Sequence, residues 1–272
     1  MPSATSAPSL KHVLTAPFRL AFTAFAFALF GLGGAGFGLL VTPVLAATSG
    51  SAAQRRRRAR RIVRWWFGRF VAVIERLGLV RVRVKNPEAF MKPGAVFTAN
   101  HPSLIDVVCL ISIVPEATTI VKASLLRNWF TRAPIRAAGY AANDAGPAAL
   151  PALAEDLASG AAFVIFPEGT RTPSDLPAGE IPRLHRGAAQ LALHTGRPIT
   201  PVRITAHPRW LTKDRGWWHL PEEPMTLTFE ALPEIEVEPY LTLYNSDARR
   251  AARRLTQDLG RLLFERPTTN AH

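Results

Sequence analysis

The chain has 272 residues, 48% hydrophobic and 19% charged, which excludes a largely disordered protein and suffices for a buried core. Its single cysteine, Cys109, excludes an intrachain disulfide framework and a multi-cysteine metal site. The net charge is +13, and residues 55–85 hold twelve basic side chains against one acidic side chain. A nucleic-acid binder usually spreads basic charge over its binding face, so this concentration argues against a nucleic-acid partner.

The first element is an apolar N-terminal segment. Residues 20–54 contain no charged side chain, and residues 20–47 are long enough to cross a bilayer as a helix. The glycines between residues 31 and 38 weaken a single straight helix, and suit close helix–helix contact or a break between two half-spans. We therefore expect residues 1–54 to anchor the chain in a membrane, as one hydrophobic helix or as a helical hairpin.

A cleaved signal peptide is the alternative for this segment, with a cleavage site near residues 44–46. The apolar run is much longer than a signal core, and the arginine-rich run 55–61 follows it directly, as in a stop-transfer sequence. Basic residues are more numerous after the run than before it, which predicts an inner-membrane protein whose main domain faces the cytoplasm.

Residues 55–79 are predicted to form a basic amphipathic helix. Apolar side chains recur at helical spacing between residues 62 and 77, and Trp65 and Trp66 would lie at headgroup level on a membrane surface. The alternative is a helix that packs on the main domain with its arginines in solvent.

The main domain is predicted over residues 80–272, where strand and helix patterns alternate. Residues 80–85 alternate between apolar and basic side chains, and short apolar runs predict further strands at 95–99, 118–121, 139–142, 161–166, 199–204 and 225–230. Helices are expected near 104–114, 124–138, 147–159, 187–195 and 246–264. The alternation indicates an α/β domain with a mixed, largely parallel sheet flanked by helices.

The strand at 95–99 leads directly into His101 and Asp106. Because Pro102 disfavours helical geometry at His101 and starts a helix well, the chain can fold back and bring carboxylate and imidazole together. Such a pair acts as a general base with the carboxylate that orients it. Ser103 could instead be the nucleophile of a hydrolase, but it lacks the glycine-flanked elbow of those enzymes.

The strand at 161–166 leads into Glu168, Gly169, Thr170 and Arg171. Gly169 allows close approach of a ligand to the backbone, Thr170 offers a hydroxyl donor, and Arg171 can hold a phosphate through two hydrogen bonds. Glu168 cannot bind phosphate, so we expect it to orient Arg171 or a backbone amide.

These motifs resemble those of the glycerolipid acyltransferases, particularly the 1-acyl-sn-glycerol-3-phosphate (lysophosphatidate) acyltransferases. The similarity includes His101 with Asp106, the run 166–171, the block that contains Lys122, and the run 198–202 around Pro201. The resemblance implies transfer of a fatty acyl group from acyl-CoA or acyl-carrier protein to the hydroxyl of a lysophospholipid in the membrane, without a cofactor or a metal. It assigns His101 and Asp106 to catalysis, and Glu168, Gly169, Thr170, Arg171, Lys122 and Pro201 to substrate binding.

One position departs from the family pattern. Ala145 stands where these enzymes usually carry an arginine that helps to hold the acceptor phosphate. Lys122, Arg136 or Arg186 could compensate, or the acceptor could be another lysolipid such as a lyso-ornithine lipid. A membrane adaptor without catalytic activity is a further alternative.

Overall fold

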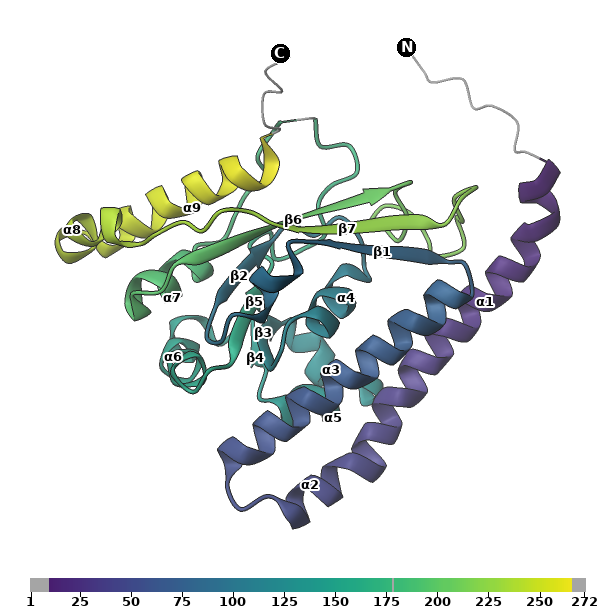
Figure 1. The fold of residues 1–272 in the computed structure, drawn as a ribbon, viewed down its shortest axis with the longest axis horizontal. Coiled ribbons are helices and arrows are strands. Elements are labelled where there is room, and N and C mark those ends of the chain that lie inside the picture. The colour runs from purple at the N-terminus through teal and green to yellow at the C-terminus, as the bar shows by residue number, and fades with distance from the viewer. Residues whose placement is uncertain (1–9, 178, 266–272) are drawn as a thin grey trace.

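The computed structural model describes residues 10–177 and 179–265 and contains a seven-stranded sheet (Figure 1). The strand order is β1-β7-β6-β2-β5-β3-β4. The strands are β1 (Val80–Lys85), β2 (Val96–Ala99), β3 (Ala117–Val121), β4 (Ala141–Ala142), β5 (Ala162–Ile165), β6 (Ile199–His207) and β7 (Met225–Ala231).

All neighbouring strands run parallel except β6 and β7, which are antiparallel. The predicted mixed, largely parallel sheet is therefore confirmed. Strand β5 pairs in parallel with both β2 and β3, so the carboxyl ends of these three strands share one edge of the sheet.

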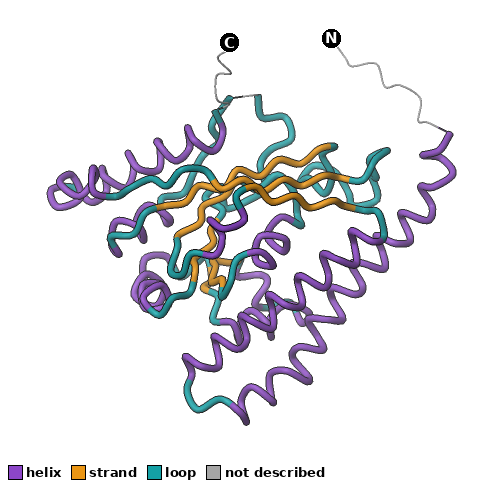
Figure 2. The backbone as a smooth tube through the Cα atoms, in the orientation of Figure 1, coloured by secondary structure: helices purple, strands orange, loops and turns teal. Residues whose placement is uncertain are grey.

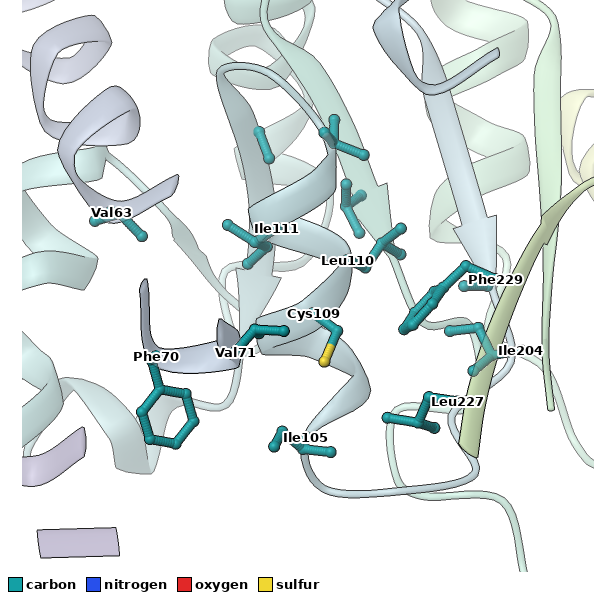
Figure 3. Close-up of a cluster of buried hydrophobic side chains, with 14 of the residues drawn as sticks. Val63, Phe70, Val71, Ile105, Cys109, Leu110, Ile111, Ile204, Leu227 and Phe229 are labelled. Atoms are coloured by element: carbon teal, nitrogen blue, oxygen red, sulfur yellow. The ribbon is translucent and has the colours of Figure 1, made fainter. Parts of the chain in front are cut away.

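Both faces of the sheet are covered, which explains the continuous apolar runs of its central strands. Adjacent residues of β2 point to opposite sides: Val96 joins a core with α6, α7 and α9, whereas Phe97 joins a core with α3 and α4. Figure 3 shows the core that contains Phe97, where Val71 of α3 lies beside Cys109 of α4. The lone cysteine is fully buried there as a small apolar side chain.

The helices of the main domain follow the predicted pattern with two differences. They are α4 (Asp106–Ile113), α5 (Trp129–Ala138), α6 (Leu150–Ala158), α7 (Gly187–Thr195), α8 (Glu238–Ser246) and α9 (Ala248–Phe264). The predicted helix at 124–138 is divided, because the side chain of Asn128 accepts the amide of Phe130 and starts α5 after a short 3-10 turn. Helix α8 was not predicted.

The N-terminal segment forms one arm of a helical hairpin (Figure 2). Helix α1 (Leu10–Gly36) continues through a π turn at Phe37–Val41 into α2 (Thr42–Thr48), and residues 49–51 connect it to α3 (Ala52–Arg76). Within this arm, Thr15–Thr48 is long and apolar enough to cross a membrane. The glycines allow close packing: a β-carbon on Gly33 would collide with the Trp66 indole of α3, and one on Gly34 with the carbonyl oxygen of Phe130.

Helix α3 packs on the main domain through several of its arginines. Arg60 is almost fully buried, donates to the carbonyl of Ala138 and forms an ion pair with Asp156 of α6. Arg57 and Arg61 pair with Glu116, and Arg64 donates to the carbonyls of Ser112 and Ile113. Trp65, in contrast, is 59% exposed. The division of the chain into a membrane segment up to residue 54, an amphipathic helix up to residue 79 and a main domain after it stays a prediction.

Candidate active site

The site forms where the ends of β2 and β5 meet at the shared edge of the sheet. Asn100 follows β2 directly, and its side-chain amide donates to the carbonyl of Ile204 at 2.8 Å and accepts the amide of Ile204 at 2.7 Å. This buried amide ties the chain to β6 just before the turn that carries His101. Sequence reasoning assigned no role to Asn100, although a buried amide at a strand end in a candidate site is a usable signal.

His101 and Asp106 lie together as predicted, with 2.7 Å between Nδ1 of His101 and Oδ1 of Asp106. The carboxylate is completely buried and fixed by two backbone amides, those of Ser103 at 2.8 Å and Val107 at 2.9 Å. Nδ1 is buried, and this carboxylate oxygen lies within ion-pair distance of it. The short distance makes this carboxylate the group that faces Nδ1, which leaves Nε2 for a substrate.

Glu168 supports the turn of His101 from the end of β5. Its Oε1 accepts the backbone amide of His101 at 2.8 Å and the hydroxyl of Thr172 at 2.8 Å, and the amide of Thr172 donates to the carbonyl of His101 at 2.7 Å. Of the two predicted partners of Glu168, the structure thus shows a backbone amide. Burial raises the pKa of Glu168, although the Thr172 hydroxyl and the His101 amide act in the opposite direction.

Arg171 reaches across to the loop between β6 and β7. Its Nη1 donates to the carbonyls of Leu211 at 2.8 Å and Thr212 at 2.7 Å. Part of the guanidinium is therefore occupied by protein, and the rest faces a cavity. Gly169 precedes it with φ of +62°, a backbone conformation that favours glycine, and a β-carbon there would press on the ring of His185.

A cavity of about 1040 Å³ connects this site with the N-terminal hairpin. At the sheet edge it is lined by His101, Gly169, Thr170 and Arg171, and at the other end by apolar side chains of α1 and α3 such as Phe30 and Phe67. The ring centroids of Phe166 and His101 lie 4.7 Å apart, so the imidazole borders an apolar side chain. The cavity thus joins a polar end with a general-base candidate to a long apolar region.

The other predicted binding residues divide into two groups. Lys122 and Arg186 line the cavity, but Pro201 lies buried within β6 and is not among the lining residues. Arg136 and Ala145 also lie outside the lining, whereas Lys213 of the β6–β7 loop, which sequence reasoning missed, is part of it. Ser103 is fully buried and its hydroxyl has no hydrogen-bond partner among the described residues, so it is not presented to a substrate.

Comparisons with known proteins concern the family of the chain and its fold. Residues 81–205 match the sequence model of the Acyltransferase family. The chain contains an acyltransferase domain. The matched region holds both strand-end motifs, from His101 to Arg171, so the resemblance stated from the motifs is confirmed.

Two curated relatives match part of the chain. A 1-acyl-sn-glycerol-3-phosphate acyltransferase from Cocos nucifera is 28% identical over 131 residues, 44% of this chain and 41% of that protein. A lyso-ornithine lipid O-acyltransferase from Pseudomonas aeruginosa is 30% identical over 157 residues, 54% of each chain. The chain thus spans about half or less of the length of these relatives.

A solved structure extends the likeness to nearly the whole fold. The 1-acyl-sn-glycerophosphate acyltransferase PlsC from Thermotoga maritima superposes with a TM-score of 0.67, covering 92% of this chain and 95% of that chain. The identity is 20%, so this likeness establishes a shared fold alone.

Proposed function

We propose that this protein transfers a fatty acyl group from a thioester, acyl-CoA or acyl-carrier protein, to the free hydroxyl of a lysophospholipid. 1-Acyl-sn-glycerol-3-phosphate is the acceptor we favour, with phosphatidate as the product. The observation that carries the proposal is the pair of His101 and Asp106 at the polar end of a cavity whose other end is apolar. A single-chain amphiphile fits such a cavity, since its headgroup and its acyl chain need different surroundings.

His101 acts as the general base in this reaction. With Nδ1 facing Asp106, Nε2 takes the proton of the acceptor hydroxyl as its oxygen attacks the thioester carbonyl. The new carbon–oxygen bond forms, the carbon–sulfur bond breaks, and the proton on His101 passes to the departing thiolate. Asp106 stabilises the transient imidazolium, and buried Ser103 leaves no exposed nucleophile for an acyl-enzyme at this turn.

Arg171, Thr170 and Lys122 are the groups we assign to the acceptor phosphate, because all three line the same cavity as His101. Arg171→Ala is expected to raise the KM for the acceptor chiefly, measured with varied acceptor at saturating donor. An unchanged acceptor KM would remove Arg171 from the phosphate site.

We propose that the N-terminal hairpin holds this site at a membrane, which the long apolar helix Thr15–Thr48 supports. One side of the continuous helix formed by α1, the π turn and α2 contacts the domain. Large apolar side chains along this helix are each more than half exposed: Phe18, Leu32, Leu39, Leu40 and Val44. We place this apolar side in the lipid of the inner membrane and the domain on the cytoplasmic side, where both thioester donors occur. Because residues 15–48 form one helix without a reversal at the glycines, we favour a single long apolar helix over two half-spans within this segment.

A lyso-ornithine lipid is the second candidate acceptor. Ala145 replaces the expected arginine, and the relative from Pseudomonas aeruginosa acts on a lyso-ornithine lipid by its name. The two candidates share the mechanism and differ in the headgroup.

The deciding experiment uses the purified full chain in detergent with labelled acyl-CoA or acyl-carrier protein and a panel of lysolipids, with products identified by mass. We expect phosphatidate from 1-acyl-sn-glycerol-3-phosphate, and no product with His101→Ala. Preferential acylation of the lyso-ornithine lipid would select the second candidate. Absence of transfer to every lysolipid by the folded protein would refute the acyltransferase proposal and favour an adaptor.

A further inference from the structure

The loop between β6 and β7, residues 208–224, has several buried side chains, and we call it the tryptophan loop. Trp210 is 4% exposed and its indole N–H donates to the carbonyl of Trp217 at 3.3 Å. Leu211 and Thr212 are buried as well. The loop contains three tryptophans that the catalytic scheme does not use.

One side of the tryptophan loop holds the two strand-end motifs. Arg171 donates to the carbonyls of Leu211 and Thr212, and the amide of Leu104, three residues after His101, donates to the carbonyl of Leu211 at 3.1 Å. Arg209 donates to the carbonyl of Ser174 at 2.6 Å. The loop is thus attached to both halves of the candidate active site.

The other side of the tryptophan loop contacts helix α1. Nη1 of Arg19 donates to the carbonyls of Pro221 at 2.6 Å and Glu222 at 3.1 Å. The ring centroids of Phe27 and Trp217 lie 5.7 Å apart. Figure 1 shows this connection at the end of β6 and β7 that lies nearest the N-terminal half of α1.

The exposed residues of the tryptophan loop continue the apolar surface of α1. Trp218 is 58% exposed and packs edge-on against Trp217, which in turn contacts Phe27. On α1, Phe18 is 68% exposed and Phe25 is 54% exposed. Exposed Lys213 and Arg215 lie near these rings in the sequence, and Arg215 pairs with exposed Asp214 at 3.8 Å. Tryptophan with an apolar ring and an N–H donor is favoured at the boundary between lipid and water, and lysine and arginine extend to the headgroups.

We infer that the tryptophan loop is a second membrane-contact site, which inserts Trp218 into the headgroup region beside α1. The inference rests on the proposed function, because that proposal sets which side of the molecule faces the membrane. Because the same loop holds Leu104 and Arg171, contact with lipid and the geometry of the active site share one element. Lys213, which lines the cavity, then lies where an acceptor headgroup leaves the bilayer.

The test places a fluorescent label at residue 218. The full chain carrying Trp218→Cys is labelled with NBD and reconstituted into vesicles of equimolar phosphatidylcholine and phosphatidylglycerol. Asn245→Cys, an exposed position on α8 at the far end of the molecule, is the matched control, and the unsubstituted chain with its buried Cys109 is the labelling blank. Lys213→Cys repeats the measurement if Trp218→Cys does not fold.

We expect nitroxide-bearing headgroup lipids to quench the label at 218 several-fold more than the label at 245, and aqueous iodide to show the opposite order. Equal quenching at both positions would overturn the inference. Protection at 218 that appears only after addition of acyl-carrier protein would overturn it too, and would assign the loop to the carrier. Because the readout needs no turnover, a failure here is separate from a failure of the acyltransferase assay.

Discussion

The strand-end loops and helix α3 both bury charged side chains, but they use them in opposite ways. In the loops, the carboxylates of Asp106 and Glu168 are held by backbone amides and a hydroxyl, which leaves the imidazole of His101 directed at the cavity. In α3, the guanidinium of Arg60 pairs with the carboxylate of Asp156 and donates to the carbonyl of Ala138. The buried charges of the loops hold the turn of His101 beside the cavity, whereas the buried charge of Arg60 attaches α3 to the main domain.

The largest effect is expected from substitutions that test whether His101 is the general base. His101→Ala and Asp106→Ala should each lower kcat by about 10²–10⁴-fold, the usual contribution of a general base. Circular dichroism and the melting temperature should change little for His101→Ala, since its side chain is at the cavity surface. A residual rate of a tenth of wild type in His101→Ala would refute its assignment as the base.

The second prediction tests the docking role of Arg60. Arg60→Ala leaves the carboxylate of Asp156 buried without its main partner, and should lower the free energy of unfolding by roughly 3–5 kcal/mol in a detergent-solubilised urea titration. The matched control is Arg58→Ala, also in α3, where the guanidinium is exposed and donates to Thr48. Its effect should stay within about 0.5 kcal/mol. Equal effects of the two substitutions would show that the buried pair does not hold α3.

The third prediction concerns Glu168 as the support of the His101 turn. Glu168→Gln keeps an acceptor for the His101 amide, and should retain activity far better than Glu168→Ala, which removes it at a cost of about 1–3 kcal/mol. The activity ratio of the two variants is the measurement. Equal losses would show that the charge, rather than the hydrogen bond, is needed.

The same residue gives a pH dependence with a defined sign. Because burial raises the pKa of Glu168, the folded protein binds this proton more tightly than the unfolded chain does. Stability should therefore fall as pH rises from the ordinary glutamate range to the raised value, and Glu168→Gln should remove that part of the slope. Melting temperatures of both proteins across this range test it; parallel curves would contradict it.

The smallest effect is expected at Glu116, which pairs with Arg57 and Arg61. Burial acts to raise its pKa, but the hydrogen bonds and charges of the two arginines outweigh it and lower the pKa. Its stabilising contribution is thus present above the ordinary pKa and lost as pH falls through the lowered one. Glu116→Gln should cost about 1 kcal/mol or less at neutral pH, since both arginines are largely exposed. A loss as large as that of Arg60→Ala would contradict the difference drawn between these two pairs.

Sequence alone determined the features that depend on short chain distances and on strand patterns. The turn at Pro102 brings His101 and Asp106 together within a few residues, and the buried runs predicted a sheet whose strand ends collect the motifs. The apolar arm was evident from length and composition, because a run of about twenty or more apolar residues without charge is typical of a membrane helix.

Only the tertiary structure decided how distant segments share their charges and surfaces. The structure decided which arginines of α3 pair with Asp156 and Glu116. It also decided that Arg171 donates to the carbonyls of Leu211 and Thr212. Both outcomes depend on contacts between residues far apart in the chain. The same holds for the tryptophan loop, which contacts both α1 and the active site. Periodicity reports which face of an element is apolar, but the partner of that face follows from the packing of all elements together.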